Sequence, residues 1–496
     1  MHDSNACAGR ASICPPLFLP AFVLLLFLIF PIIVLGQAGD ASISGRVSDP
    51  AGRVVHQAEV SIKNIATNIA VATVTNEAGI YTFPSLPPGE YVLTVRKQGF
   101  QSVDLVGLTL YTQDRLERNF ALSVGSASES VTVTAGTTND SPAVSMTVSR
   151  EFVEDMPLNG RSFQDLIQLA PGAVSTSTGY SIDGQRTDSN NYTVDGVSAN
   201  LGGIVNSSSA NSGFALAGTA PAQTALGTTQ PLASVDSLQE FKIQTSGYAA
   251  EFCRNPGGQV QFITRSGTND VHGTLFDYLR NTDFDANSFY NDYYDVAQTA
   301  EHQNDFGGTL GGPLAIPHVY DGRNKSFYFL SYEGLRLLLP SSYSSYLPSQ
   351  GLRDAANINV QPFLNTAPLP NKGPNSDGCT VVDPTTNQTA ACDGLFYAGY
   401  SYPNNLDNYS ARIDQNFGQR FHGFVRYADT PSSVNTGGPQ PTESIVNIHN
   451  WTAGLTSTIS RTLLDDLRFN YSRDAEQSGT PQTRSEERRV GKECLE

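Results

Sequence analysis

Residues 408–416 read Asn-Tyr-Ser-Ala-Arg-Ile-Asp-Gln-Asn, and this stretch decides the fold of the chain. Successive side chains of a β-strand point to opposite faces, so a strand here would separate apolar from polar residues. One face would carry Tyr409, Ala411 and Ile413, and the other Ser410, Arg412 and Asp414. The same alternation recurs in residues 450–460. An apolar outer face with a polar inner face is typical of a lipid-embedded, water-lined β-barrel.

Seven candidate strands follow Asn269. They are Val271–Arg280, Asn304–Leu314, Lys325–Arg336, Asn408–Asn416, Arg420–Asp429, Asn450–Ser460 and Leu463–Arg473. Between these bounds the first, third and fifth connections are long, and the second, fourth and sixth are short. Outer-membrane barrels alternate in this way, with their short turns on the periplasmic side. We therefore predict that residues 270–483 form part of a transmembrane antiparallel β-barrel.

The last residues, 484–496, are an abrupt mixture of basic and acidic side chains that resembles the in-frame translation of a sequencing adapter. We expect this stretch to be an artefact; the alternative is a natural charged tail. Seven strands do not close such a barrel, and an open barrel in lipid would leave unsatisfied edges that cost several kcal/mol per group. The chain is therefore expected to be a non-functional fragment of a longer protein.

An apolar run from Leu17 to Leu35 follows Arg10, and small residues follow at Gly36 and Ala38. This order predicts a secretory signal peptide over 1–36, cleaved near Gly36 or Ala38. An uncleaved membrane anchor is the alternative, since the run approaches spanning length. No later segment is apolar enough to span a membrane as a helix, so further membrane residence would require strands.

Charge and cysteine spacing narrow the function classes. The formal net charge of −17 argues against a nucleic-acid partner, which needs clustered Lys and Arg. Cys379 and Cys392 bracket a short polar stretch and could form a disulfide in an oxidising compartment; two unpaired thiols are the alternative. No Cys/His spacing suggests zinc, so we predict no metal site.

Short alternating strands separated by turn residues predict a β-sandwich over 41–123. Three motifs mark it: Gly-x-Val-x-Asp-x-x-Gly from Gly45, Asn-Glu-x-Gly-x-Tyr-x-Phe from Asn76, and Leu-Pro-Pro-Gly-x-Tyr from Leu86. Together they resemble the carboxypeptidase regulatory-like domain. That family lacks a peptidase active site, so the resemblance implies a spacer or docking module.

A polar linker over 124–147 contains a β-prone heptapeptide: Glu129, Ser130, Val131, Thr132, Val133, Thr134 and Ala135. It resembles the TonB box, the segment that the inner-membrane-anchored TonB protein binds by strand addition. An extended peptide suits this role because it offers unpaired backbone groups to the edge of a partner's sheet. The alternative is that these residues form an ordinary terminal strand of the sandwich.

Residues 148–269 carry several motifs in order. A short helix around residues 165–170 is stopped by Pro171-Gly172, and a strand at 192–197 ends in a turn. Three further motifs, at 180–186, 237–245 and 257–269, complete the series. Asp195-Gly196 suits a turn with positive φ. The series resembles the α+β plug of Oar-like TonB-dependent receptors. It departs from that pattern at Cys253, where the family carries Gly.

The predicted fold is mainly β, with an N-terminal β-sandwich, an α+β plug and the first strands of an incomplete barrel. The resemblance implies a receptor that imports a scarce ligand (oligosaccharide, peptide or siderophore) through the outer membrane, energised by TonB, with sandwich and plug on the periplasmic side. The barrel surface would contact outer-membrane lipid. The alternative is a non-transporting adhesin or binding scaffold. We find no nucleophile elbow or positioned acid–base pair, and predict neither an enzyme nor a cofactor.

Overall fold

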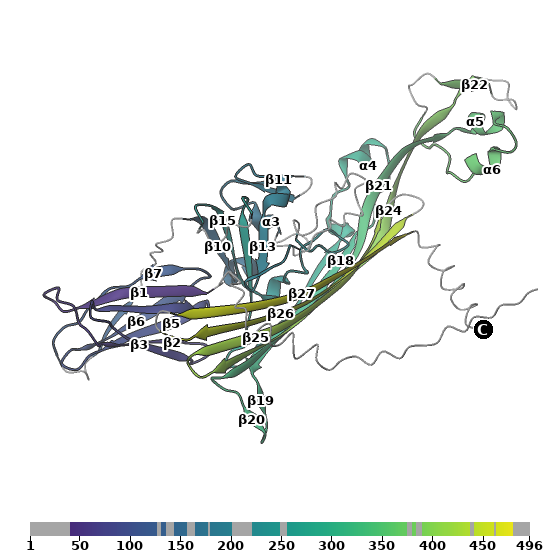
Figure 1. Ribbon diagram of the computed structural model, residues 1–496. Coiled ribbons are helices and arrows are strands. Elements are labelled where there is room, and N and C mark those ends of the chain that lie inside the picture. Colours follow the sequence, from purple (N-terminus) through teal and green to yellow (C-terminus); the bar gives the residue numbers. More distant parts are fainter. Residues whose placement is uncertain are drawn as a thin grey trace, which may run out of the picture. The chain divides into compact units, whose positions relative to one another are not determined.

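The computed structural model is shown in Figure 1. It describes residues 40–125, 130–134, 143–155, 164–176, 179–200, 221–248, 255–373, 379–382, 389–436, 441–460 and 463–479. The predicted signal peptide 1–36, Cys253 and the predicted artefact 484–496 lie outside these ranges. Within them, no helix combines the length and the apolar character needed to cross a membrane.

The N-terminal domain is a sandwich of two sheets, as predicted. The first contains β4 (Ile80–Leu86), β1 (Ala41–Ser48) and β7 (Arg115–Glu117) in that order, with β8 (Phe120–Ala121) also on β1. The second runs β3 (Ala70–Val74), β2 (Glu59–Asn64), β5 (Gly89–Arg96), β6 (Ser102–Leu110) and β9 (Ser130–Thr134). Ile43 and Phe83 of the first sheet share one buried core with Ile62 and Leu93 of the second. The alternation seen in the sequence places these side chains inward.

The plug is a five-stranded sheet with short helices. Its elements are β10 (Val144–Ser149), α2 (Arg150–Asp155), α3 (Gln164–Ile167), β11 (Ala173–Thr176), β12 (Gly179–Ile182), β13 (Asn191–Val194), β14 (Val197–Ser198), β15 (Leu238–Ser246) and β16 (Gln259–Thr264). The sheet order is β10-β15-β16-β13-β14, with β13 parallel to β16. Helix α3 ends before Pro171-Gly172, as predicted, and Gly172 has a φ of 79°. Helix α2 was not predicted.

The seven predicted barrel strands are present and pair antiparallel in sequence order (Figure 1). They are β17 (His272–Asn281), β18 (His302–Pro313), β21 (Ser326–Pro348), β24 (Asp393–Phe417), β25 (Phe421–Thr436), β26 (Thr442–Thr458) and β27 (Leu464–Gly479). The first connection carries α4 (Phe289–Tyr293), and the second carries β19 (Ala315–Ile316) and β20 (Tyr320–Asp321). The third carries α5 (Gln350–Ala355), α6 (Gln361–Leu364), β22 (Thr380–Val382) and β23 (Thr389–Ala391).

The faces of these strands follow the predicted alternation. On β24, Tyr409 and Ile413 are exposed, whereas Arg412 and Asp414 are buried. On β26, Trp451 and Leu455 are exposed, whereas Thr452 is buried. The sheet does not close on itself, because β17 and β27 are its two ends.

Two expectations about the strands were wrong. Most strands are longer than predicted: β21 has 23 residues and β24 has 25. The fifth connection is also short, because β25 and β26 continue their pairing to Thr436 and Thr442. Backbone pairing across two adjacent strands stabilises these ends even where the side chains do not alternate cleanly, so a pattern-based boundary falls too early.

Candidate functional site

A tight turn brings the plug to the barrel wall. Val194 pairs with Val197 across Asp195-Gly196, and both turn residues have positive φ, 50° and 82°. Such φ values belong to the two-residue turn whose twist matches a hairpin, and Asp and Gly tolerate them best. The Asp195 carboxylate accepts hydrogen bonds from the backbone N–H of Thr264 at 2.9 Å and from the Thr264 hydroxyl at 2.9 Å. The turn is thereby fixed to the end of β16.

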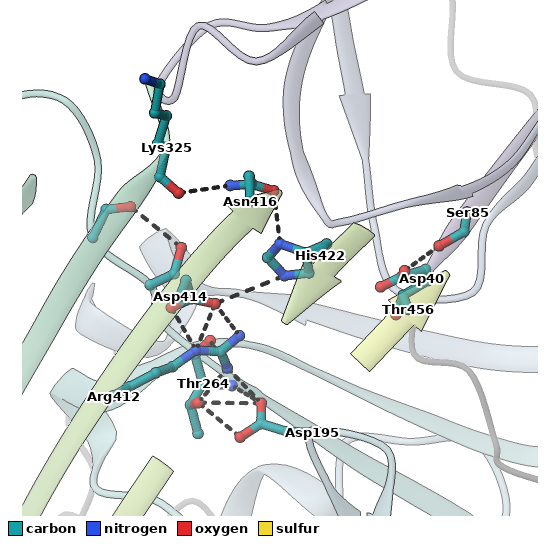
Figure 2. Close-up of polar contacts among 12 residues, drawn as sticks. Asp40, Ser85, Asp195, Thr264, Lys325, Arg412, Asp414, Asn416, His422 and Thr456 are labelled. Carbon is teal, nitrogen blue, oxygen red and sulfur yellow. Dashed lines mark hydrogen bonds and ion pairs between the residues drawn. The ribbon is translucent and has the colours of Figure 1, made fainter. Parts of the chain in front are cut away.

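Arg412 of the wall meets this carboxylate (Figure 2). Its Nη1 lies 3.0 Å from Asp195 Oδ1 and also donates to Thr264 Oγ1 at 2.9 Å. Its Nε and Nη2 donate to the two oxygens of Asp414, at 2.9 and 2.8 Å. The guanidinium also lies 4.3 Å from the centre of the Phe424 ring, within the range of a cation–π contact. One cation of the wall therefore joins one carboxylate of the plug to one of the wall.

The cluster is screened from water. Asp195, Arg412 and Asp414 are 5%, 8% and 2% exposed. Charged groups at such depth are tolerated when their hydrogen-bonding atoms are paired, and removing one partner costs about 3–5 kcal/mol. On the same wall, His422 Nδ1 lies 2.9 Å from Asn416 Oδ1, and its Nε2 lies 3.8 Å from Asp414 (Figure 2). The arrangement can anchor a plug; it offers no positioned nucleophile.

Further wall side chains bind plug backbone. Three contacts share this pattern: Asn408 Nδ2 to Gln230 O at 2.7 Å, Arg426 Nη2 to Leu232 O at 3.1 Å, and Ala225 N to Ser432 Oγ at 2.9 Å. Val434, Val446 and Ile448 of the wall belong to the same buried cluster as Phe241 and Ile243 of the plug. Plug and wall therefore share an apolar core as well as the ionic cluster.

The predicted TonB-box-like segment is the last strand of the sandwich. Ser130, Val131, Thr132, Val133 and Thr134 form β9, which pairs in parallel with β6 from Ser102 to Val106. Glu129 and Ala135, the two ends of the segment, lie outside the described residues. Residues 130–134 therefore form a terminal strand of the sandwich, which was the alternative to a TonB box. The role of the segment as a TonB box stays a prediction.

The sandwich contacts the plug through charged side chains that sequence reasoning missed. Lys242 Nζ of β15 donates to Thr112 O at 2.8 Å and lies 3.4 Å from Asp114 Oδ1. The backbone N–H of Thr112 donates to Glu240 Oε1. Thr112, Asp114, Glu240 and Lys242 are all buried. Burial raises the pKa of the Glu240 carboxyl to about 7, partly offset by its bonds to Thr112.

Cys379 and Cys392 are joined by a disulfide, with their Cα atoms 5.5 Å apart. The bond lies in the third connection, beside β22 and β23. Neither cysteine belongs to the plug anchor formed by Asp195, Arg412 and Asp414. Within the described ranges, no group of three or more His, Cys, Asp or Glu side chains could hold a metal ion.

Alternation predicted that Arg412 faces inward, and turn chemistry predicted Asp195-Gly196, but no local signal joins residues 217 positions apart. Lys242 and Glu240 lie in the motif at 237–245, where the sequence alone marks them only as ordinary polar residues. A charged pair two residues apart in a strand shares one face, and its presence among apolar neighbours was the available signal.

Comparison with known proteins agrees with this architecture. Residues 42–123 match the carboxypeptidase regulatory-like domain, and residues 263–491 match an outer membrane beta barrel domain. Over 318 residues the chain is 29% identical to the TonB-dependent transporter Oar of Myxococcus xanthus, covering 61% of this chain and 28% of that protein. The chain thus spans less than a third of the relative it matches.

Two solved structures show partial likeness. The outer membrane transporter YddB of Escherichia coli gives a TM-score of 0.46 at 14% identity, over 70% of this chain and 41% of that one. The ferric enterobactin receptor of Pseudomonas aeruginosa gives a TM-score of 0.40 at 11% identity, over 68% of this chain and 42% of that one.

Proposed function

We propose that the whole protein imports a scarce ligand through the outer membrane. The proposal is supported by the homology of the chain to a TonB-dependent transporter and by its outer membrane beta barrel domain, which indicate residence in that membrane. TonB would supply the energy by pulling on the segment that precedes the plug, residues 129–135. The ligand would be an oligosaccharide, a peptide or a siderophore, bound at the extracellular loops and the plug apex. These roles are mechanical and require no bond chemistry in the receptor.

The observation that carries the proposal is the attachment of the plug at both edges of its sheet. β10, the first strand of the plug sheet, follows β9 after a short stretch of chain and pairs with β15. The hairpin at the other edge carries Asp195, which Arg412 binds at 3.0 Å. A pull on β9 reaches the plug sheet at the edge opposite its wall anchor. The plug would therefore be displaced first on the β10 side while Arg412 retains the far edge.

Binding to TonB tests the coupling role directly. We would measure the affinity of the detergent-solubilised chain for the purified periplasmic domain of a TonB protein. Deletion of residues 129–135 should abolish binding. Thr132→Pro, which removes a backbone donor and fixes φ, should weaken it at least ~10-fold, whereas Thr132→Ala should not.

Unchanged binding after the deletion would overturn the coupling role. In that case the alternative of a non-transporting surface protein, which needs no TonB, becomes the better account. Amide exchange of β2 and β5 in the deletion variant serves as the folding control, since both strands lie inside the sandwich sheet and away from β9.

A further inference from the structure

Strands β21 and β24 continue as a two-stranded ribbon beyond their neighbours in the sheet (Figure 1). β18 pairs with β21 as far as Leu338, and β25 pairs with β24 as far as Asn405. The two long strands go on pairing with each other to Pro348 and Asp393, without a shift of register. Side chains two residues apart on a strand share a face, so each face of the ribbon extends one face of the barrel wall.

The first connection covers one face of this ribbon. Tyr397 is 4% exposed, and its hydroxyl donates to Asn291 Oδ1 at 3.0 Å. The Tyr397 ring also stacks on the ring of Tyr294, with the two centres 4.6 Å apart. The hydroxyl of Ser401 donates to the backbone carbonyl of Ala300 at 2.6 Å. This face is therefore occupied by another part of the same chain.

The opposite face carries four half-buried aromatic rings, which we call the aromatic ladder: Tyr343 of β21, and Phe396, Tyr400 and Tyr402 of β24. The rings of Tyr400 and Tyr402 are nearly parallel, with an angle of 4° between their planes and 6.1 Å between their centres. Tyr343 meets Tyr400 and Phe396 edge to face, at 6.4 and 6.3 Å. The ladder thus offers a run of ring surface along the ribbon.

The aromatic ladder lies on the plug-bearing face of the wall. Tyr402 and Asn408 are an even number of positions apart in β24, so their side chains share a face. The side chain of Asn408 donates to the backbone carbonyl of Gln230 in the plug, at 2.7 Å. A ligand that travels from outside toward the plug would therefore pass along the ladder.

The charge of this face separates the three ligand classes. Between 339 and 347 of β21 and between 394 and 406 of β24, the residues on the ladder side include no Asp, Glu, Lys or Arg. An anionic siderophore is bound best by Arg or Lys. An extended peptide is typically bound through its backbone at a strand edge. A sugar ring, by contrast, has a face of C–H groups that packs on an aromatic ring, and hydroxyls at its rim for Tyr and Ser.

We propose that the aromatic ladder is a binding surface for an uncharged oligosaccharide, whose sugar rings stack on Tyr400 and Tyr402. This rests on the proposed function and selects one of its three ligand classes. The ladder holds the saccharide on the ribbon before it reaches the plug. Tyr343 and Phe396 extend the surface along the ribbon, so a chain of several sugars is bound better than a single sugar.

Isothermal titration of the full chain with maltohexaose, xylohexaose and chitopentaose, in a detergent without a sugar headgroup, tests the ladder. At least one of the three should bind. Tyr400→Leu should weaken that binding at least ~5-fold, whereas Tyr400→Phe, which keeps the ring, should change it less than ~2-fold. Tyr346→Leu is the matched control, because Tyr346 is 55% exposed on the other face of the same ribbon. The affinity should change less than ~2-fold between about 50 and 500 mM NaCl, since no ionic contact is involved.

Failure of all three saccharides to bind, or equal binding by the parent and the Tyr400→Leu variant, would overturn the proposal. So would binding of ferric enterobactin or of an uncharged hexapeptide that requires Tyr400 while the saccharides do not bind. Affinity for the periplasmic domain of TonB is measured on the same samples. Saccharide binding without TonB affinity contradicts the coupling role alone, and TonB affinity without saccharide binding contradicts the ladder alone.

Discussion

Asp195 of the plug and Arg412 of the barrel wall form a buried ion pair at 3.0 Å between residues 217 positions apart. Thr264 shares both partners: its hydroxyl donates to Asp195 and accepts from Arg412. The pair is also held on the wall side by Asp414. Since the three charged groups are almost fully buried, each depends on the others for compensation.

Removal of the wall cation should loosen the plug. Arg412→Met would leave Asp195 and Asp414 buried without their cation, which should lower the free energy of unfolding by about 3–5 kcal/mol. Urea titration in detergent, with protease sensitivity of the plug as the signal, measures the loss. Arg323→Met, at an exposed loop arginine, is the matched control and should change stability by less than ~0.5 kcal/mol. Equal losses of unfolding free energy in the two variants would show that the ion pair of Arg412 does not stabilise the plug.

The contact between sandwich and plug should weaken as pH rises. The pKa of Glu240 is about 7 in the folded chain and 4.5 in its unperturbed state, with Lys242 and Asp114 as its charged neighbours. The folded state then binds the proton more tightly, so stability is greatest below about pH 4.5 and falls as pH rises to about 7. The loss through this one carboxyl is on the order of 3 kcal/mol.

Glu240→Gln should remove most of that dependence. Urea midpoints at pH 5 and pH 8 should differ less in this variant than in the parent, and the variant should be the more stable of the two at pH 8. Glu77→Gln, at an exposed turn glutamate, controls for a change of net charge. If the stability of the Glu240→Gln variant depends on pH as strongly as that of the parent, groups other than Glu240 cause the dependence.

The disulfide should stabilise the third connection locally. Replacement of both Cys379 and Cys392 by Ser removes a cross-link over a sequence separation of 13, worth roughly 3 kcal/mol in the chain-entropy model. Proteolysis between β21 and β24 should become at least ~10-fold faster. Cleavage within the plug should keep its rate, which separates a local from a global effect. Equal loop cleavage with and without the bond would contradict this role.

Much of the fold could be predicted because its signals are local. The alternation at Tyr409–Asp414 predicted which face of β24 turns inward, and Asp195-Gly196 predicted a turn with positive φ. Strand ends were less predictable. The C-terminal half of β21 contains Pro340 and several Ser and Tyr residues, and its apolar and polar side chains do not alternate regularly. It nevertheless pairs with β24 as far as Pro348. Pairing between strands, which local pattern does not encode, decides such boundaries.

The site depended on longer-range information. Asp195 and Arg412 meet because the plug lies against the inner face of the wall, and Lys242 reaches Thr112 across 130 positions. The two interpretations of residues 129–135 looked exclusive in the sequence. In the structure the described part of the segment is the terminal strand of the sandwich sheet, and its role as a TonB box stays a prediction.

The single tryptophan of the chain offers the most direct test of the central claim, that the apolar faces of the seven strands contact lipid. Trp451 is 47% exposed on the outward face of β26, opposite the face that carries buried Thr452. We would compare its fluorescence in micelles of a brominated and an unbrominated alkyl maltoside. We expect strong quenching by the brominated chains and little by iodide in the aqueous phase. Quenching by iodide with none by the brominated chains would place Trp451 in water and contradict a lipid-facing barrel wall.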